Sequence, residues 1–184
     1  MDQLQQPAFP DFLRESLRRA GLSASSFVWC EPEELPPPCH GLLVHEVDMT
    51  STLERHHGEP MALEVLVDGE ANGHYFREVI LRGANSGKPA EFGLIEIEVA
   101  QFPENLREVI RSGRQPLGGI LNASGMHYVS RPLGYFSVAR EQLPSKLSAL
   151  GSGETFFGRY NQLSTEDGIC LARIIEILSS TPNP

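Results

Sequence analysis

Strand-like segments joined by short turns dominate the middle of this sequence. Residues 61–67 (MALEVLV) and 74–81 (HYFREVIL) are separated by the turn-forming residues DGEANG, and residues 91–100 (EFGLIEIEVA) follow the turn GANSGKP. Segments rich in β-branched and aromatic residues, separated by a few turn residues, are typical of β-hairpins. An antiparallel sheet is therefore the simplest structure for this part of the chain.

Further strands are expected towards the C-terminus, in residues 126–138, 156–163 and 168–178. Helix start and stop signals bracket four short segments, which are residues 10–21, 48–58, 102–113 and 114–125. Strands that outnumber helices predict an α+β fold, with an antiparallel sheet and helices packed on one side of it. Glu96 and Glu98 alternate with apolar residues, so we expect them on a solvated face of the sheet.

The composition is that of one ordinary globular domain, with 184 residues, 40% hydrophobic residues and a formal net charge of -9. An acidic surface repels phosphate backbones and anionic lipids, so nucleic acid is not the expected partner. The N-terminus lacks the pattern of a signal peptide and no stretch is long enough to span a membrane, so a cytoplasmic protein is expected. The three cysteines and six histidines have no metal-site spacing, so no metal is expected.

The first 40 residues are expected to form a helix and a proline-rich lead-in to one domain over residues 41–184. Phe12, Leu13 and Leu17 recur at helical spacing. The segment EPEELPPP, residues 31–38, can neither propagate a helix nor donate to a sheet. A single domain that acts as a monomer or a small homo-oligomer is expected.

Arg77 is the residue that bears most directly on function. Side chains alternate between the two faces of a strand, so Arg77 shares a face with Tyr75, Val79 and Leu81. A guanidinium group in an apolar row stays charged, and burying it alone is costly. A negative or strongly accepting group is therefore expected beside Arg77.

Glu176 is likewise the only acid in its row on the last strand, which also holds Cys170, Ala172, Ile174 and Leu178. Two interpretations remain open. Arg77 and an acid such as Glu176 can form a structural buried pair. Alternatively, both can face a cavity, where arginine binds a carboxylate through two hydrogen bonds and glutamate meets a ligand hydroxyl group.

Residues 116–119 (PLGG) offer backbone N–H groups that side chains do not shield. At the start of a helix such groups suit an anion. Two adjacent glycines also occur in ordinary tight turns, and this alternative remains open.

The order of these segments resembles the chorismate pyruvate-lyase family. FREVIL at 76–81, GKP at 87–89 and PLGGIL at 116–121 are similar to the family's R-E-[IV]-[LI]-L, G-x-P and P-L-G-x-x-L, in the same order. Residues 42–58 resemble the segment in which a Met-Thr stretch begins a helical flap over the pocket. The resemblance covers residues 42–178 and implies a six-stranded antiparallel sheet whose flanking helices enclose a buried ligand pocket.

Members of this family convert chorismate into 4-hydroxybenzoate and pyruvate without a cofactor. Carried over by position, the resemblance implies that Arg77 binds the ring carboxylate of a small aromatic acid. It implies that Leu117 donates a backbone N–H to this carboxylate, that Gly118 lies beside it, and that Met49 lies on the flap.

The resemblance also implies a catalytic glutamate near the end of the last strand, where it meets the hydroxyl end of the ligand. An ungapped match from residues 157–159 places Ile174 at this position, and a turn two residues longer at 164–168 (STEDG) places Glu176 there. We expect Glu176, because this polar turn is a natural place for the extra length.

The expected activity is therefore that of a chorismate lyase that serves quinone or other 4-hydroxybenzoate-derived biosynthesis. One alternative is a non-catalytic protein that binds an aromatic acid, because the effector-sensing domains of some transcription regulators resemble this fold. The other is a divergent biosynthetic enzyme that acts on another aromatic acid.

Overall fold

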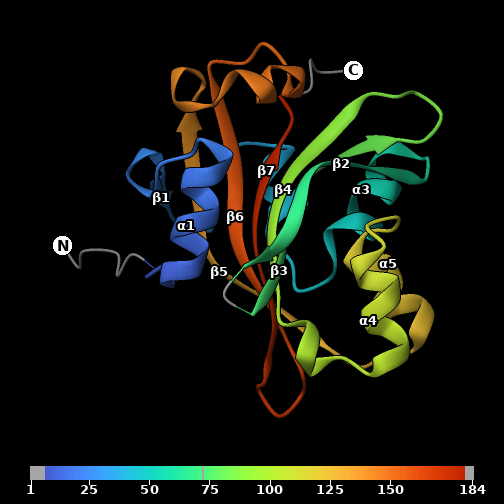
Figure 1. The fold of residues 1–184 in the computed structure, drawn as a ribbon. Helices are drawn as coiled ribbons and strands as arrows, with labels where there is room; N and C mark the ends of the chain where they lie inside the picture. The colour runs from blue at the N-terminus through green and yellow to red at the C-terminus, as the bar shows by residue number, and fades with distance from the viewer. Residues whose placement is uncertain (1–6, 72, 181–184) are drawn as a thin grey trace.

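The chain forms a seven-stranded antiparallel sheet in the computed structural model, which describes residues 7–71 and 73–180 (Figure 1). The strand order is β1-β5-β6-β7-β4-β3-β2. The strands are β1 Val28–Cys30, β2 Met61–Ala71, β3 His74–Gly83, β4 Pro89–Ile97, β5 Val129–Ala139, β6 Thr155–Ser164 and β7 Cys170–Leu178. The antiparallel sheet with flanking helices that the sequence predicts is confirmed.

The expected count of six strands is wrong, because β1 adds a seventh strand at the edge of the sheet. It pairs with β5, and Trp29 lies opposite Phe136. A segment of three residues is too short to show the alternation that marks a strand. Packing holds it in place, since the Trp29 ring contacts the rings of Phe136, Phe27 and Phe9.

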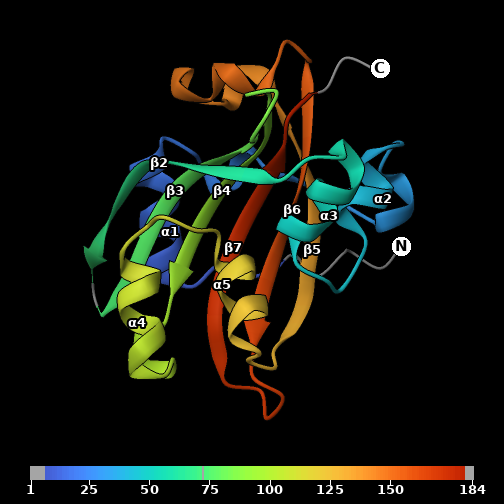
Figure 2. The ribbon, with the colours of Figure 1, turned by 90° about the vertical axis from the view of Figure 1, so that its right-hand side faces the viewer.

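The helices cover both faces of the sheet, not one face as expected (Figures 1 and 2). Helix α1 lies on one face, together with the 3-10 segment Ser145–Leu150. On the other face lie α2, α3, α4 and α5. The bounds are α1 Asp11–Ala20, α2 Cys39–Leu43, α3 Met49–His57, α4 Glu104–Arg111 and α5 Leu117–Ser124. Within the described ranges, every helix is too short or too polar to cross a membrane.

Helix α1 packs its apolar side on the sheet, so the start of the chain contributes to the core. Leu13 and Leu17 are fully buried among Phe92 and Ile175 of the sheet. The expectation that Glu96 lies on a solvated face is wrong, because it is buried beneath α1, where the Ser16 hydroxyl donates to its carboxylate. Burial raises the pKa of Glu96 to about 7.

Candidate functional site

A cavity of about 60 Å³ lies between the sheet and the first turns of α3 and α5. Strands β3, β4, β6 and β7 form its floor. All five residues that the sequence names as candidates line this cavity, namely Met49, Arg77, Leu117, Gly118 and Glu176. Residues that the sequence analysis did not single out also line it, among them Asp48, Glu91, Gly93 and Asn161.

The strand register explains why these side chains meet. Antiparallel pairing places residues from four strands side by side on one face of the sheet. One row is Val79, Gly93, Glu176 and Arg159, and the next row is Arg77, Ile95, Ile174 and Asn161. Gly93 lies in the middle of the floor, and the lack of a side chain there leaves space above the sheet.

Arg77 is buried at one end of the cavity, and it forms no ion pair with an acid of the described residues. Its side chain is only 2% exposed, and its Nε and Nη1 atoms have no hydrogen-bond partner among the described residues. The ion pairs of the described residues do not include it either. Burial lowers the pKa of the guanidinium, and Tyr75 and Asp68 offset this only in part. Arginine remains protonated in proteins, so a buried positive charge faces the cavity.

Two helix N-termini border the cavity. Asp48 caps α3 by accepting a hydrogen bond from the Ser51 backbone N–H at 2.8 Å, and α5 begins directly after Pro116. The first N–H groups of a helix have no partner within the helix, and they carry the positive end of its dipole. At α3 the Asp48 carboxylate already occupies this position, so it is the start of α5 that remains open to a negative group.

The lack of a side chain at Gly118 allows the starts of α3 and α5 to approach each other closely. A Cβ atom at this position would lie only 2.9 Å from the Cβ and Oδ1 atoms of Asp48, a separation that side chains do not tolerate. The PLGG segment thus forms the start of α5, not an isolated tight turn.

Glu176 forms its ion pair with Arg159 and not with Arg77. The Arg159 Nε atom donates to the Glu176 carboxylate across adjacent strands, and both side chains are buried. Sequence reasoning missed Arg159. A signal was present, since Arg159 shares a strand face with Phe157 and Leu163 and is the only charged residue in that row.

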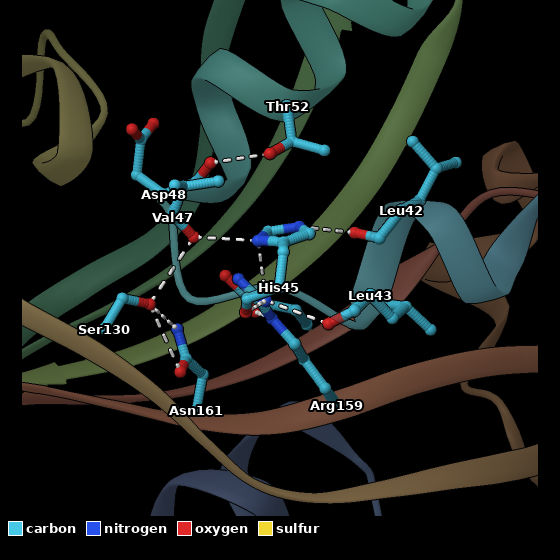
Figure 3. A network of polar contacts seen from close by, with 10 residues as sticks. Leu42, Leu43, His45, Val47, Asp48, Thr52, Ser130, Arg159 and Asn161 are labelled. Carbon is cyan, nitrogen blue, oxygen red and sulfur yellow. Dashed lines mark hydrogen bonds and ion pairs between the residues drawn. The ribbon is translucent and has the colours of Figure 1, made fainter. Parts of the chain in front are cut away.

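Arg159 also holds the loop that leads into α3 (Figure 3). Its Nη1 atom donates to the carbonyl oxygens of Leu43 at 3.0 Å and His45 at 3.1 Å. Burial and the nearby Arg159 charge lower the pKa of His45.

A second contact ties the same loop to β5. The Asn161 amide donates to the Ser130 hydroxyl at 3.1 Å, and this hydroxyl lies 3.5 Å from the carbonyl oxygen of Val47 (Figure 3). Together with Arg159, these contacts fix the start of α3 above the cavity.

Glu91 is a further acid that lines the cavity, and sequence reasoning missed it as well. Its side chain is 3% exposed, and its Oε2 atom has no hydrogen-bond partner among the described residues. Burial, and then the negative charge of Glu176, raise the pKa of Glu91 well above its ordinary value. The sequence carried a signal here too, because Glu91 begins a row that continues with Gly93, Ile95 and Ile97.

The cavity therefore has two chemically different ends. Arg77 makes one end positive. Glu91 and Glu176 make the other end acidic, and mainly apolar side chains, such as those of Val79, Ile95 and Ile174, line the space between them. An elongated molecule with an anionic group at one end and a polar, uncharged group at the other matches this arrangement.

Neither protein-family models nor curated protein sequences give a match to this chain. Solved structures, in contrast, do match this chain. The effector domain of PhnF from Mycobacterium smegmatis has a TM-score of 0.52 at 12% identity, and the match covers 73% of this chain and 89% of that domain. The gene product SA0254 from Staphylococcus aureus has a TM-score of 0.50 at 11% identity, with 72% and 87% covered.

The whole PhnF chain matches with a TM-score of 0.52 at 12% identity. This match covers 74% of this chain and 65% of PhnF. A ligand-binding domain assigned to a GntR-family transcriptional regulator of Bordetella bronchiseptica has a TM-score of 0.49 at 11% identity, with 67% and 91% covered. At these identities the likeness is one of fold. The chain has the α+β fold of the PhnF effector domain, and the motif resemblance to chorismate lyases is compatible with this fold.

Proposed function

We propose that this chain binds a small aromatic or pre-aromatic carboxylate in the cavity beneath α3 and α5. The observation that carries the proposal is the buried Arg77 guanidinium, which lines a cavity and whose Nε and Nη1 atoms have no hydrogen-bond partner among the described residues. A buried charge of this kind is costly unless an anion completes it. A ligand carboxylate can do so through two parallel hydrogen bonds.

The shape of the floor supports an elongated, flat ligand. Arg77 and Glu176 lie on β3 and β7, with β4 between them. Two strand spacings of about 4.8 Å place their backbones about 10 Å apart across the sheet. Their side chains can therefore reach opposite ends of one substituted ring, whose faces would lie against Val79 and Ile95.

The cavity must widen when such a ligand enters. Its volume of about 60 Å³ has room for only a few water molecules. An engineered protein cavity that takes up benzene measures about 150 Å³. The buried Met49 side chain at the start of α3 lies over the cavity, so we infer that it moves aside on binding.

The fold of the PhnF effector domain favours a binding role, in which the chain responds to a small molecule. Chorismate pyruvate-lyase activity is the second candidate. The observation that favours it is that Met49, Arg77, Leu117 and Glu176 line a single cavity, as the motif resemblance implies. Loss of the enolpyruvyl group makes the ring aromatic, so a site that positions the substrate and excludes water can suffice without a cofactor.

Calorimetric titration with 4-hydroxybenzoate tests the binding role. We expect the unaltered chain to bind and Arg77→Ala to lose about 100-fold in affinity, because a buried charge-assisted contact is removed. Arg82→Ala is the matched control, since Arg82 lies on the same strand but pairs with Glu64 near the surface. Equal affinities of the Arg77→Ala variant and the unaltered chain would contradict the proposal.

Incubation with chorismate distinguishes the two candidates. Release of 4-hydroxybenzoate and pyruvate supports the lyase, whereas tight 4-hydroxybenzoate binding without turnover supports the binding role. If the chain is a lyase, Glu176→Gln lowers turnover more than binding. Unchanged turnover in this variant would remove Glu176 from the mechanism.

A further inference from the structure

We propose that Glu91 is a specificity-determining residue that selects anionic ligands with a hydroxyl group at the end remote from the carboxylate. This inference rests on the proposed binding of a carboxylate at Arg77. In the bound state, the Glu91 carboxyl group donates a hydrogen bond to the ligand hydroxyl oxygen. The same hydroxyl group donates its own hydrogen to the Glu176 carboxylate.

The first observation is the position of Glu91 close to Glu176 on the cavity floor. Gly93 lies opposite Glu176 on β7, and Glu91 precedes Gly93 by two residues on the same face of β4. Glu91 and Glu176 are therefore diagonal neighbours on adjacent strands, within reach of long side chains. The Glu91 Oε1 atom lies 3.5 Å from the place that a Cβ atom on Gly93 would take, so the carboxyl group leans towards the middle of the cavity floor.

The second observation concerns the hydrogen bonding of the Glu91 carboxyl group. Oε2 of Glu91 is buried without a hydrogen-bond partner among the described residues. Arg159 is the cation near it. The Nε and Nη1 atoms of Arg159 donate to Glu176 and to the carbonyl oxygens of Leu43 and His45, and its buried Nη2 atom has no partner among the described residues. Buried polar groups are nearly always paired, so this carboxyl group is free to pair with a ligand atom that enters the cavity.

The two acids differ in their partners, which sets their roles. Glu176 accepts a hydrogen bond from the Arg159 Nε atom in a buried ion pair. Burial and the charge on Glu176 raise the pKa of Glu91 and so favour its protonated form, because two neighbouring buried carboxylates are costly to charge together. Glu91 is then a hydrogen-bond donor and Glu176 an acceptor.

This arrangement defines the chemical class of the ligand. A hydroxyl group is both acceptor and donor, so it satisfies both acids at once. An aromatic amine can donate to Glu176 but accepts poorly from Glu91, and an unsubstituted ring does neither. A second carboxylate at this end would be repelled by Glu176. The site therefore fits a hydroxylated monoanion best.

Calorimetric titration of the whole chain at pH 6 with 4-hydroxybenzoate, 4-aminobenzoate and benzoate tests the inference. We expect the hydroxylated ligand to bind at least about tenfold more tightly than the amine, because the amine leaves a buried donor unsatisfied. Glu91→Gln should keep this preference, since an amide also donates. Glu91→Leu should reduce it to less than about threefold while benzoate binds as before.

Glu96→Gln is the matched control, because Glu96 is also a buried glutamate on β4 but lies beneath α1 on the opposite face. A Glu91→Leu variant that keeps the full preference overturns the role of Glu91 and leaves the carboxylate-binding proposal intact. Failure of all three acids to bind the unaltered chain overturns both proposals.

The pH dependence of this ligand preference distinguishes a direct role of Glu91 from a purely structural one, because a structural role would leave it unchanged. In the unaltered chain, the preference for 4-hydroxybenzoate over 4-aminobenzoate should fall as the pH rises and Glu91 loses its proton. In Glu91→Gln, this preference should not change with pH. The charged and titratable groups that face Glu91 are Glu176 and Arg159, which both variants retain. Parallel profiles for the unaltered chain and Glu91→Gln would overturn the inference, even if Glu91→Leu does not fold.

Discussion

Arg159 on β6 and Glu176 on β7 lie opposite each other on adjacent strands and form a buried ion pair. Because Glu176 is neutralised there, it is not available to Arg77, which lies two strands away on β3. The face of the sheet that lines the cavity thus contains two arginines, of which only Arg159 forms an ion pair among the described residues. This asymmetry underlies both the proposed binding site and the effects of mutations on stability.

Breaking the pair from one side should be costly. We expect Arg159→Met to lower the free energy of unfolding by about 3 to 5 kcal/mol, because it leaves the Glu176 carboxylate buried without compensation. The double variant Arg159→Met/Glu176→Leu should recover part of this loss. Urea unfolding at neutral pH measures both effects, and a double variant less stable than Arg159→Met would contradict the explanation.

Replacing Arg77 should have the opposite effect on stability. Arg77→Met removes a buried charge that forms no ion pair among the described residues and keeps much of the side-chain volume, so we expect the free energy of unfolding to rise by about 1 to 3 kcal/mol. The same variant should lose the rise in melting temperature that 4-hydroxybenzoate gives to the unaltered chain. A clear loss of stability in Arg77→Met would show that the fold itself satisfies the guanidinium.

The two glycines at the start of α5 should respond differently to the same substitution. A Cβ atom on Gly118 would clash with Asp48, whereas one on Gly119 would have no heavy atom within 4 Å. Gly118→Ala should therefore destabilise the chain and weaken ligand binding, because it separates α3 from α5. Gly119→Ala should be neutral or stabilising by up to about 1 kcal/mol, since alanine favours a helix over glycine.

Thermal unfolding and ligand titration of these two variants measure the difference. Similar behaviour of the two would show that the close approach of α3 and α5 at Asp48 does not matter for the site.

Glu96 should make stability depend on pH. Its pKa is raised from the ordinary value of 4.5 to about 7 in the folded chain. Below about pH 4.5 the group is protonated in both the folded and the unfolded states. Between about 4.5 and 7 the unfolded chain loses the proton and the folded chain keeps it, so the contribution of Glu96 to stability falls as the pH rises.

Glu96→Gln removes this titration. We expect the stability of the variant relative to the unaltered chain to increase from pH 4.5 to pH 7 and to level off above that. Urea unfolding at several pH values checks this, and a difference that does not change with pH would contradict it. Taking the difference between the two chains cancels the similar contribution of Glu91.

The sequence by itself determined the local structure and the faces of the strands. Alternation of polar and apolar residues and the turn residues between them act over a few positions, so the hairpins could be predicted. The same alternation placed Arg77 and Glu176 each in a row of apolar side chains. Short motifs also pointed to Met49, Leu117 and Gly118, and all of these residues line one cavity.

Only the tertiary structure decided which charges meet. Arg159 and Glu176 are 17 residues apart, and their pairing depends on the register of β6 and β7. The same holds for Glu91, which lies near Glu176 only because β4 and β7 are neighbours in the sheet. Charge pairing follows from strand order and burial, which no local pattern encodes. For this reason the sequence could name an arginine in need of an anion but could not show that the protein's own acids leave it without one.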